Sequence, residues 1–236
     1  MSTLRDRADA AAQVFVDDLD APVPSADDAH HLLRVLRLRD GEVVLASDGA
    51  GSWRRCEVRR GGLEPIGPVV LDEPAASPIA VWLPALKGDR AEWAVAKLTE
   101  LGVDEIGLLA CERGSVRPDA VGAARMLARW RRVAREAAAQ SRRARLPELL
   151  GPRDVAAAVA AGARRCDLDG ALGVRGGETL LVGPEGGWSD AERGGREESV
   201  SLADTVLRTE TAAVTAAVLL ASVRRSARHD AGLEAQ

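Results

Sequence analysis

Tyrosine is absent from this sequence, and Phe15 is its single phenylalanine. Alanine, valine and leucine must therefore supply most of the packing, and a 46% share of hydrophobic residues is enough for a proper core. Cysteine is scarce as well: Cys56, Cys111 and Cys166 are far apart and odd in number. That pattern excludes a disulfide framework and lacks the spacing of a zinc site. We expect three reduced thiols in a cytoplasmic protein that holds no metal.

Long hydrophobic runs are missing too. No window reaches the roughly 18 apolar residues that a membrane-spanning helix needs, and the first seven residues are charged without an apolar stretch. We therefore expect neither a secretory signal nor a membrane partner. The glycine patterns of dinucleotide-binding and triphosphate-binding loops do not occur, so those two chemistries have no support.

Charge is nearly balanced along the chain as a whole. With 32 basic and 36 acidic side chains the net charge is −4, which excludes a generally polycationic surface. Residues 125–145 are the exception, because they hold eight arginines and one acid, Glu136. A solvated helix face normally mixes the two signs. The local excess therefore favours contact with nucleic-acid phosphates.

Two domains are indicated by a change of pattern near residue 75. Before it, short extended runs at residues 43–46 and 56–58 flank a hairpin turn signal at 48–51, which suggests a small β-barrel. Residues 28–36 favour a short helix. Four prolines between residues 65 and 78 then interrupt the chain. We place one domain at residues 1–74 and the other at 75–236.

The second domain is predicted to be α/β with a parallel sheet. A strand at 79–83, a helix that Asp89 can cap and Gly102 can end, and a strand at 106–110 form a βαβ unit. Helices are expected at 122–141 and 152–161, strands at 179–183 and 199–207, and a last helix at 210–228. No internal repeat is evident.

Two strand-to-helix switches are the most informative segments. An apolar run ends in Gly-Pro-Glu-Gly-Gly at residues 183–187, and residues 206–212 form a second switch. Glycines at both ends of the first loop permit unusual backbone angles, and such a loop brings bare N–H and C=O groups close to a ligand. Those groups suit the edge of an adenine, and apolar neighbours can sandwich its ring. We expect the two loops to shape one pocket.

The motifs resemble the RsmE family of ribosomal RNA methyltransferases, within the SPOUT class of knotted S-adenosylmethionine enzymes. The matching segments, in the family's order, are residues 31–38, 86–90, 97–103, 112–113, 136–141, 183–187 and 207–212. The resemblance implies a PUA-like barrel that helps to hold RNA, a deep trefoil knot that holds the cofactor, and a homodimer. It also implies methylation of uridine N3 in 16S ribosomal RNA of the 30S subunit. One departure follows Leu202, where relatives usually have glycine and this sequence has Ala203-Asp204.

The resemblance and the residue chemistry together give a set of candidate site residues. Arg208 is the candidate to stabilise deprotonated uridine, and Glu210 is the candidate to accept its proton or to position Arg208. Glu185, in the opposite loop, is a second candidate for the same job as Glu210. The expected S-adenosylmethionine contacts are Leu181, Val182, Gly183, Pro184, Glu185, Gly186, Gly187, Leu202, Leu207, Arg208 and Thr209. The expected RNA contacts are Arg34, Arg37, Lys87, Arg113, Arg135, Gln140, Arg142 and Arg143.

Three other functions stay open at this point. A related enzyme acting on another nucleotide or on ribose would use the same pocket. An RNA-binding assembly factor without activity would keep the fold, although an intact Arg208-Thr209-Glu210 argues against it. A nucleotide-binding metabolic enzyme would leave the arginines of residues 125–145 unexplained.

Overall fold

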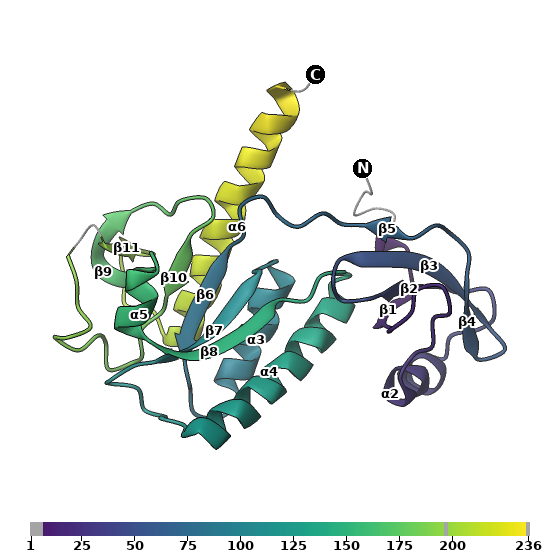
Figure 1. Ribbon diagram of the computed structural model, residues 1–236, viewed down its shortest axis with the longest axis horizontal. Helices are drawn as coiled ribbons and strands as arrows, with labels where there is room; N and C mark the ends of the chain where they lie inside the picture. Colours follow the sequence, from purple (N-terminus) through teal and green to yellow (C-terminus); the bar gives the residue numbers. More distant parts are fainter. Residues whose placement is uncertain (1–6, 196–197, 235–236) are drawn as a thin grey trace. The chain divides into compact units, whose positions relative to one another are not determined.

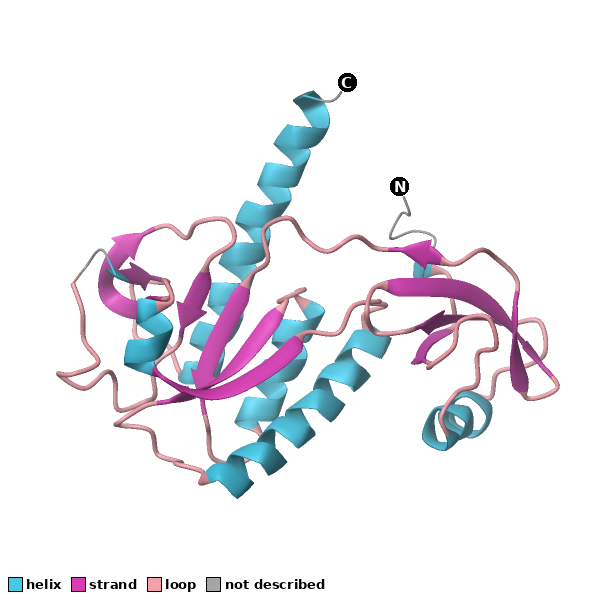
Figure 2. Cartoon of the chain, in the orientation of Figure 1, coloured by secondary structure: helices cyan, strands magenta, loops and turns pink. Residues whose placement is uncertain are grey.

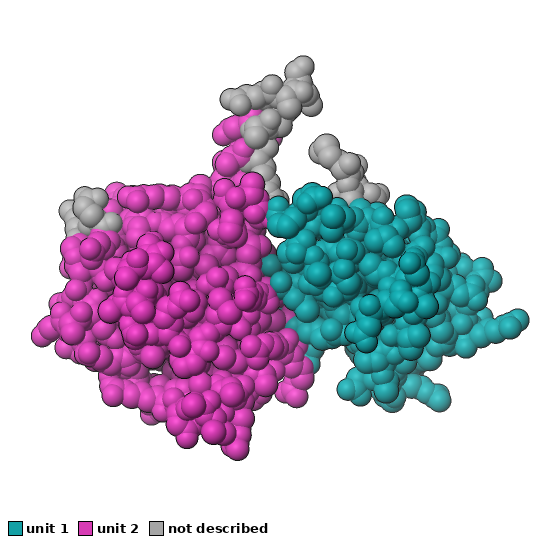
Figure 3. All heavy atoms as spheres, in the orientation of Figure 1, with its two compact units in different colours: residues 1–74, 135–146 teal, residues 75–134, 147–236 magenta. Residues whose placement is uncertain are grey.

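The computed structural model describes residues 7–195 and 198–234 and comprises two compact units (Figure 3). One unit takes residues 1–74 and 135–146, and the other takes 75–134 and 147–236. The sequence assigned everything beyond residue 74 to the second domain. The structure differs in giving residues 135–146 to the first unit, and the hydrogen bonds described below are the reason.

The first unit is built on a five-stranded sheet. Strands β1, β2, β3 and β4 lie in that order, β5 pairs with β3, and the β1–β2 pair is the parallel one. Asp48 shapes the predicted hairpin turn, since its carboxylate accepts from the N–H groups of Ala50 and Ser52. The strand bounds are Ala12–Phe15 (β1), Val43–Ser47 (β2), Ser52–Arg59 (β3), Gly62–Pro65 (β4) and Val70–Leu71 (β5).

Residues 135–146 are held in the first unit by hydrogen bonds to two of its strands. Gln13 of β1 donates to the carbonyl of Arg143 at 2.8 Å, and Ser47 of β2 donates to the carbonyl of Ala144 at 2.9 Å. Ala144 is buried with Leu45 and Trp53. A short helix, α2 (Ala26–His30), continues into a π-helical turn, η1 (His31–Val35), where residues 28–36 predicted a helix.

The second unit has a parallel six-stranded sheet, with the strands in the order β11-β9-β10-β6-β7-β8 (Figure 1). This confirms the predicted α/β class. The strand bounds are Ala80–Pro84 (β6), Glu105–Ala110 (β7), Glu148–Asp154 (β8), Arg164–Leu172 (β9), Thr179–Leu181 (β10) and Ser199–Ser201 (β11).

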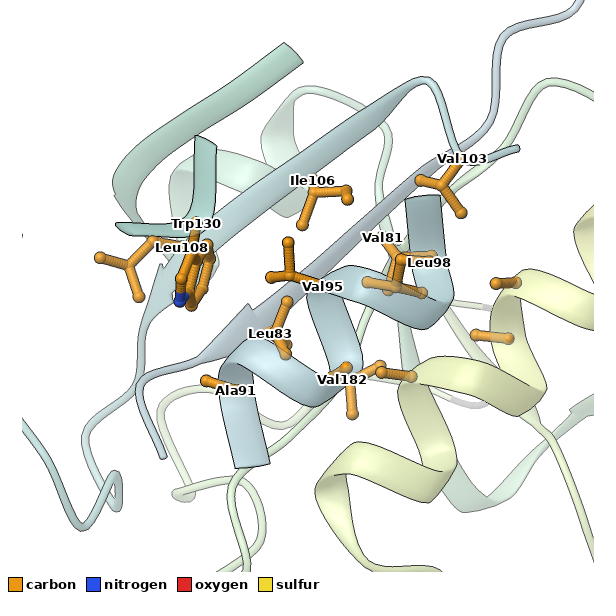
Figure 4. Packing of buried hydrophobic residues seen from close by; sticks show 14 of the residues in the cluster. Val81, Leu83, Ala91, Val95, Leu98, Val103, Ile106, Leu108, Trp130 and Val182 are labelled. Carbon is orange, nitrogen blue, oxygen red and sulfur yellow. The ribbon is translucent and has the colours of Figure 1, made fainter. Parts of the chain in front are cut away.

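Helices cover both faces of this sheet (Figure 2). Alternating residues of β6 separate the two cores: Val81 and Leu83 pack toward α3 and α6, and Trp82 packs on the side of α5. Figure 4 shows the larger core, where Trp130 of α4 joins Leu108 and Val95. Among the described helices, none is long and apolar enough to cross a membrane. The helix bounds are Arg90–Glu100 (α3), Ala120–Gln140 (α4), Val155–Ala160 (α5) and Thr209–Glu234 (α6).

Two sequence expectations for this sheet were wrong. The strand expected at 199–207 stops at Ser201, and residues 202–208 form a loop that leaves Val206 87% exposed. Strands β8 and β9 were not predicted. The shortened β11 and the unpredicted β9 lie together at one edge of the sheet, and β8 is the opposite edge strand.

Gly107 is expected to be essential for the sheet. A Cβ at this position would lie 1.9 Å from the ring of Trp82, which is 1% exposed and cannot move aside. Gly107→Ala should therefore lower the free energy of unfolding by about 3 kcal/mol, the upper range for overpacking. Urea denaturation measures the loss. Gly195→Ala is the control, because a Cβ there meets nothing within 4 Å; equal stability of the two variants would contradict the prediction.

Candidate active site

A cavity of about 250 Å³ opens where four segments of the second unit meet. The segments are the end of β10 with its following loop, the loop after β11, the start of α6 and the middle of β9. Its lining residues are Cys166, Asp167, Leu168, Val182, Gly183, Pro184, Glu185, Gly187, Trp188, Arg193, Leu202, Ala203, Thr205, Val206, Leu207, Thr209 and Ala212. The two motif loops predicted from the sequence therefore do shape one pocket.

Each glycine of the loop at 183–187 has its own structural reason. Gly187 has a φ of +67° and closes a turn by donating to the carbonyl of Pro184. Gly183 lies against an indole, since a Cβ there would be 3.1 Å from the Trp188 ring. Gly186 lies equally close to the carbonyl of Arg113. The expectation of unusual backbone angles at both ends of the loop thus holds at Gly187, while close contact is what requires glycine at 183 and 186.

Trp188 forms an apolar wall of the cavity. Its side chain is 4% exposed, and its indole N–H donates to the carbonyl of Cys166 at 3.0 Å. This bond ties the glycine-rich loop to β9. Burial raises the pKa of the Cys166 thiol well above its usual range, so that thiol stays protonated in the wall of the cavity.

Thr209 joins the two motif loops directly. Its hydroxyl donates to the carbonyl of Gly183 at 3.0 Å, and its side chain is buried at the first residue of α6. The sequence predicted Thr209 to be a cofactor contact. In the structure its hydroxyl fixes the distance between the end of β10 and the start of α6.

Glu192 attaches a third segment to the glycine-rich loop. Its buried carboxylate accepts from the backbone N–H of Glu112 at 2.7 Å and from that of Ser189 at 3.0 Å. The Glu112-Arg113 segment follows β7. Its position next to residues 183–187 is therefore set by a carboxylate that the sequence did not single out.

The predicted cofactor residues separate into two groups. Eight of them line the cavity: Val182, Gly183, Pro184, Glu185, Gly187, Leu202, Leu207 and Thr209. Leu181, Gly186 and Arg208 do not. Leu181 is fully buried in the core on the side of α5, and Arg208 is exposed between two lining residues. Among the described residues, no hydrogen bond or ion pair is seen for the Arg208 side chain.

Sequence reasoning missed the contribution of β9 to the cavity. Cys166, Asp167 and Leu168 line it, and so do Arg193, Ala203 and Ala212. Apart from Ala203, a departure from the family's pattern, and Ala212, the last residue of the motif at 207–212, no sequence feature marked these positions.

An arginine and two glutamates form a charged cluster beside the cavity. Nη1 of Arg90 lies 2.8 Å from Oε1 of Glu185 and 3.6 Å from Oε2 of Glu210. Glu210 is the more buried acid, with its side chain 12% exposed against 38% for Glu185. The two candidate carboxylates therefore share one cation, which comes from the start of α3.

Comparison with known proteins agrees with this site. The RNA methyltransferase domain family matches residues 73–221, and the RNA methyltransferase PUA domain family matches residues 24–63. The ribosomal RNA small subunit methyltransferase E of Mycobacterium tuberculosis is 34% identical over 218 residues, which cover 82% of this chain and 83% of the relative. The chain belongs to the ribosomal RNA small subunit methyltransferase E family.

Further proteins are similar to this chain. The enzyme of that name from Bacillus subtilis is 28% identical over 219 residues, which cover 80% of this chain and 84% of the relative. A structure of the family from Neisseria gonorrhoeae, bound to S-adenosyl methionine, is 25% identical with a TM-score of 0.76 and covers 90% and 97% of the two chains. A methyltransferase from Legionella pneumophila in complex with the cofactor SAM is 27% identical with a TM-score of 0.73, and here the match covers 91% and 97%.

The RNA contacts expected for a member of this family fall into three groups. Arg34, Arg37, Lys87, Arg113 and Gln140 are exposed. Arg135 is half-exposed, and its guanidinium donates to the carbonyl of Phe15 while lying 4.8 Å from the Phe15 ring centre. Arg142 and Arg143 are half-buried, and Arg142 donates to four backbone carbonyls. The exposed group is accessible to solvent, with Arg113 3.9 Å from the carboxylate of Asp190, whereas Arg135 and Arg142 have contacts within the structure.

Proposed function

We propose that this protein methylates N3 of a uridine in 16S ribosomal RNA of the 30S subunit, with S-adenosylmethionine as methyl donor. The observation that carries the proposal is the cavity between the two motif loops, with an exposed arginine and a buried carboxylate at its edge. Membership of the family supports it. We also propose the finer features that the resemblance implies: a trefoil knot in the second unit, a closed barrel in the first, a homodimer and action in the cytoplasm.

The cavity suits the proposed cofactor in its shape and chemistry. Val182, Leu202, Leu207 and Trp188 provide apolar surfaces for a flat adenine ring. The turn at Gly187 leaves the backbone of the loop without side-chain cover on one side, where a Cβ would meet nothing within 4 Å. Asp167, Glu185 and Arg193 line the same cavity and can bind the polar ends of a ligand. The bound cofactor would supply a methyl group on a positively charged sulfur.

Residues around the cavity can be assigned to the individual steps of the reaction. Uridine N3 carries a proton that must leave before the nitrogen can attack, and Glu210 is the carboxylate proposed to accept it. The negative charge then spreads over O2, N3 and O4 of the base, where the Arg208 guanidinium is proposed to stabilise it. A bond forms from N3 to the methyl carbon, and the carbon–sulfur bond breaks with its electron pair on sulfur.

The hydroxyl of Thr209 should matter for holding the donor. Thr209→Val keeps the size of the side chain but removes the bond to the Gly183 carbonyl, so the two loops lose their direct link. We expect about tenfold weaker S-adenosylmethionine binding and a loss of about 1–2 kcal/mol of stability. Calorimetric titration and urea denaturation measure the two effects. Thr209→Ser, which retains the hydroxyl, should bind as the wild type does; equally weak binding by both variants would contradict the role of the hydroxyl.

The RNA is proposed to lie along exposed basic residues of both units. Arg34 and Arg37 belong to the PUA-domain match, while Lys87 and Arg113 follow strands β6 and β7. Phosphate contacts of this kind position the RNA without reading its sequence. The target base must leave its stack to reach the cavity, as is usual for enzymes that modify base edges.

The decisive experiment supplies purified 30S particles that lack the modification. They are incubated with the protein and S-adenosylmethionine labelled in the methyl group, and the RNA is digested for nucleoside mass spectrometry and mapped. We expect N3-methyluridine at one position. A different methylated nucleoside would refute the uridine-N3 assignment in favour of another target. Cofactor binding without any transfer, or no cofactor binding, would favour an assembly factor.

A further inference from the structure

Three charged side chains from three separate elements meet at the edge of the cavity. Arg90 is the first residue of α3, Glu185 lies in the glycine-rich loop, and Glu210 lies in the first turn of α6. The closest approach is the ion pair of 2.8 Å between Arg90 and Glu185. Arg90 thereby lies between one carboxylate from each of the two motif segments.

The burial of Glu210 makes this cluster unusual. Its side chain is 12% exposed. Oε2 of Glu210 is buried without a hydrogen-bond partner in the described part of the chain, and Nη1 of Arg90 lies 3.6 Å away from it. Removing a carboxylate from water is costly unless a cation or a hydrogen-bond donor compensates. For the residues that the structure describes, Arg90 is the one cation within 4.0 Å of this carboxylate.

The orphaned oxygen also has a free capacity to accept a proton. A carboxylate that already received two hydrogen bonds would be a poor acceptor, whereas Oε2 has its acceptor sites open. The carboxylate is held by one guanidinium, and that guanidinium is held in turn by Glu185. Arg90 is more exposed than Glu210, with 32% of its side chain accessible. Its guanidinium therefore lies between the solvent and the more buried carboxylate of Glu210.

We propose that Arg90 is a positioning residue for methyl transfer, which holds the Glu210 carboxylate in place to accept the proton of the target base. The inference rests on the proposed function. In the step itself, the N3 proton moves to Glu210, the N3 lone pair bonds to the methyl carbon, and the carbon–sulfur pair stays on sulfur. Arg90 gains and loses no proton, and its guanidinium orients the Glu210 carboxylate before the step.

The geometry requires a guanidinium at this position. One nitrogen of Arg90 faces a carboxylate of the glycine-rich loop and a carboxylate of α6, and Nε points at the carbonyl of Lys87 at 3.4 Å. The planar fork of an arginine can serve several acceptors in fixed directions, while a lysine offers a single point charge. Arg90→Lys should therefore retain part of the function, and Arg90→Met, which keeps the apolar stem, should lose it.

The test compares Arg90→Met and Arg90→Lys with the control Lys97→Met. Lys97 forms a 2.7 Å ion pair with Glu100 on the same helix, so the control removes a cation and an ion pair from α3 without touching the cavity. We expect kcat on 30S particles to fall about 100-fold in Arg90→Met, the range for losing a working acid–base group. Cofactor affinity and Tm should stay close to those of Lys97→Met, and Arg90→Lys should recover about tenfold of the loss.

A purely structural role would give a different result. In that case Arg90→Met would lower Tm and cofactor affinity together with kcat, and guanidinium ion added to Arg90→Ala at millimolar concentration would restore nothing. Unchanged kcat in Arg90→Met, with wild-type enzyme making N3-methyluridine, would overturn the inference and leave the proposed function standing. A wild-type product other than N3-methyluridine would refute the proposed target, while the same 100-fold loss in Arg90→Met on that product would still support the positioning role.

Discussion

Arg208→Ala is expected to lower kcat by about 1,000-fold while leaving the affinity for S-adenosylmethionine within about twofold of the wild-type value, as for the loss of one preorganised charge stabiliser. The side chain is exposed, does not line the cavity, and makes no hydrogen bond or ion pair among the described residues. Its loss therefore removes little from the fold or from the cofactor walls. What it removes is a positive charge beside the place where the uridine becomes negative.

Single-turnover methylation of 30S particles and calorimetric titration separate the two quantities. Arg175→Ala is a matched control, because Arg175 is an exposed arginine of the same unit that does not line the cavity. Full activity in Arg208→Ala would refute its catalytic role and leave Arg90 as the guanidinium nearest the proposed proton acceptor. A parallel loss of cofactor binding would instead assign Arg208 to the donor site.

The βαβ unit at residues 79–110 could be predicted closely because its signals are local. β6 is fully buried and β7 largely so, and both show as apolar runs. Gly102, with a φ of +81°, lies just beyond the last turn of α3 as the sequence predicted. The cap is different in detail: Asp89 occupies the N-cap position but its side chain makes no capping hydrogen bond.

Strand β9 escaped prediction because its partners are distant in the sequence. Arg164 and Arg165 look like surface residues, yet both are buried. Arg164 pairs with Glu178, and Arg165 pairs with Glu198. Charged residues enter a sheet only when such partners compensate them, and no periodicity in the sequence shows which acid will do so. The cavity residues Cys166 and Asp167 were missed with their strand.

In the site as well, features set by neighbouring residues in the sequence could be predicted, and contacts between distant residues could not. Both motif loops were recognised, and so was the candidate acid Glu210. The apolar run before Arg208 was wrongly predicted to be a strand, because residues that line a cavity are as apolar as residues that line a core. Arg90 was visible as a basic residue after a strand. Its ion pairs with Glu185 and Glu210, about 95 and 120 positions away in the sequence, are visible only in the folded structure.

Arg142 is a predicted RNA contact that already makes several hydrogen bonds within the first unit. The sequence predicts an RNA contact within the arginine-rich segment. The structure shows its guanidinium donating to the carbonyls of Ala139 and Gln140 at the end of α4, and to those of Ala10 and Ala11 near β1. Burial lowers the pKa of this guanidinium, and the residue has a φ of +60°. These contacts make Arg142 a helix C-cap within the first unit.

Arg142→Met should consequently destabilise the first unit by about 4 kcal/mol, which is two charged hydrogen bonds at about 2 kcal/mol each. Only the part-buried bonds to Ala139 and Ala10 are counted, since the other two carbonyls can turn to water. Such a loss approaches the whole stability of a small domain. Hydrogen exchange followed by mass spectrometry should show β2 and β3 losing protection while β6 and β7 keep theirs.

Arg34→Met separates this effect from RNA binding, because Arg34 is an exposed arginine of the same unit. It should leave the exchange of β2 and β3 unchanged and should lower the slope of log affinity for RNA against log salt by about one, as for the loss of one phosphate contact. If Arg142→Met behaved like Arg34→Met, with protected strands and a reduced salt slope, Arg142 would be the RNA contact that the sequence predicts. If it unfolds the first unit, the arginine-rich segment serves folding at one end, and only its exposed members remain candidates for phosphate binding.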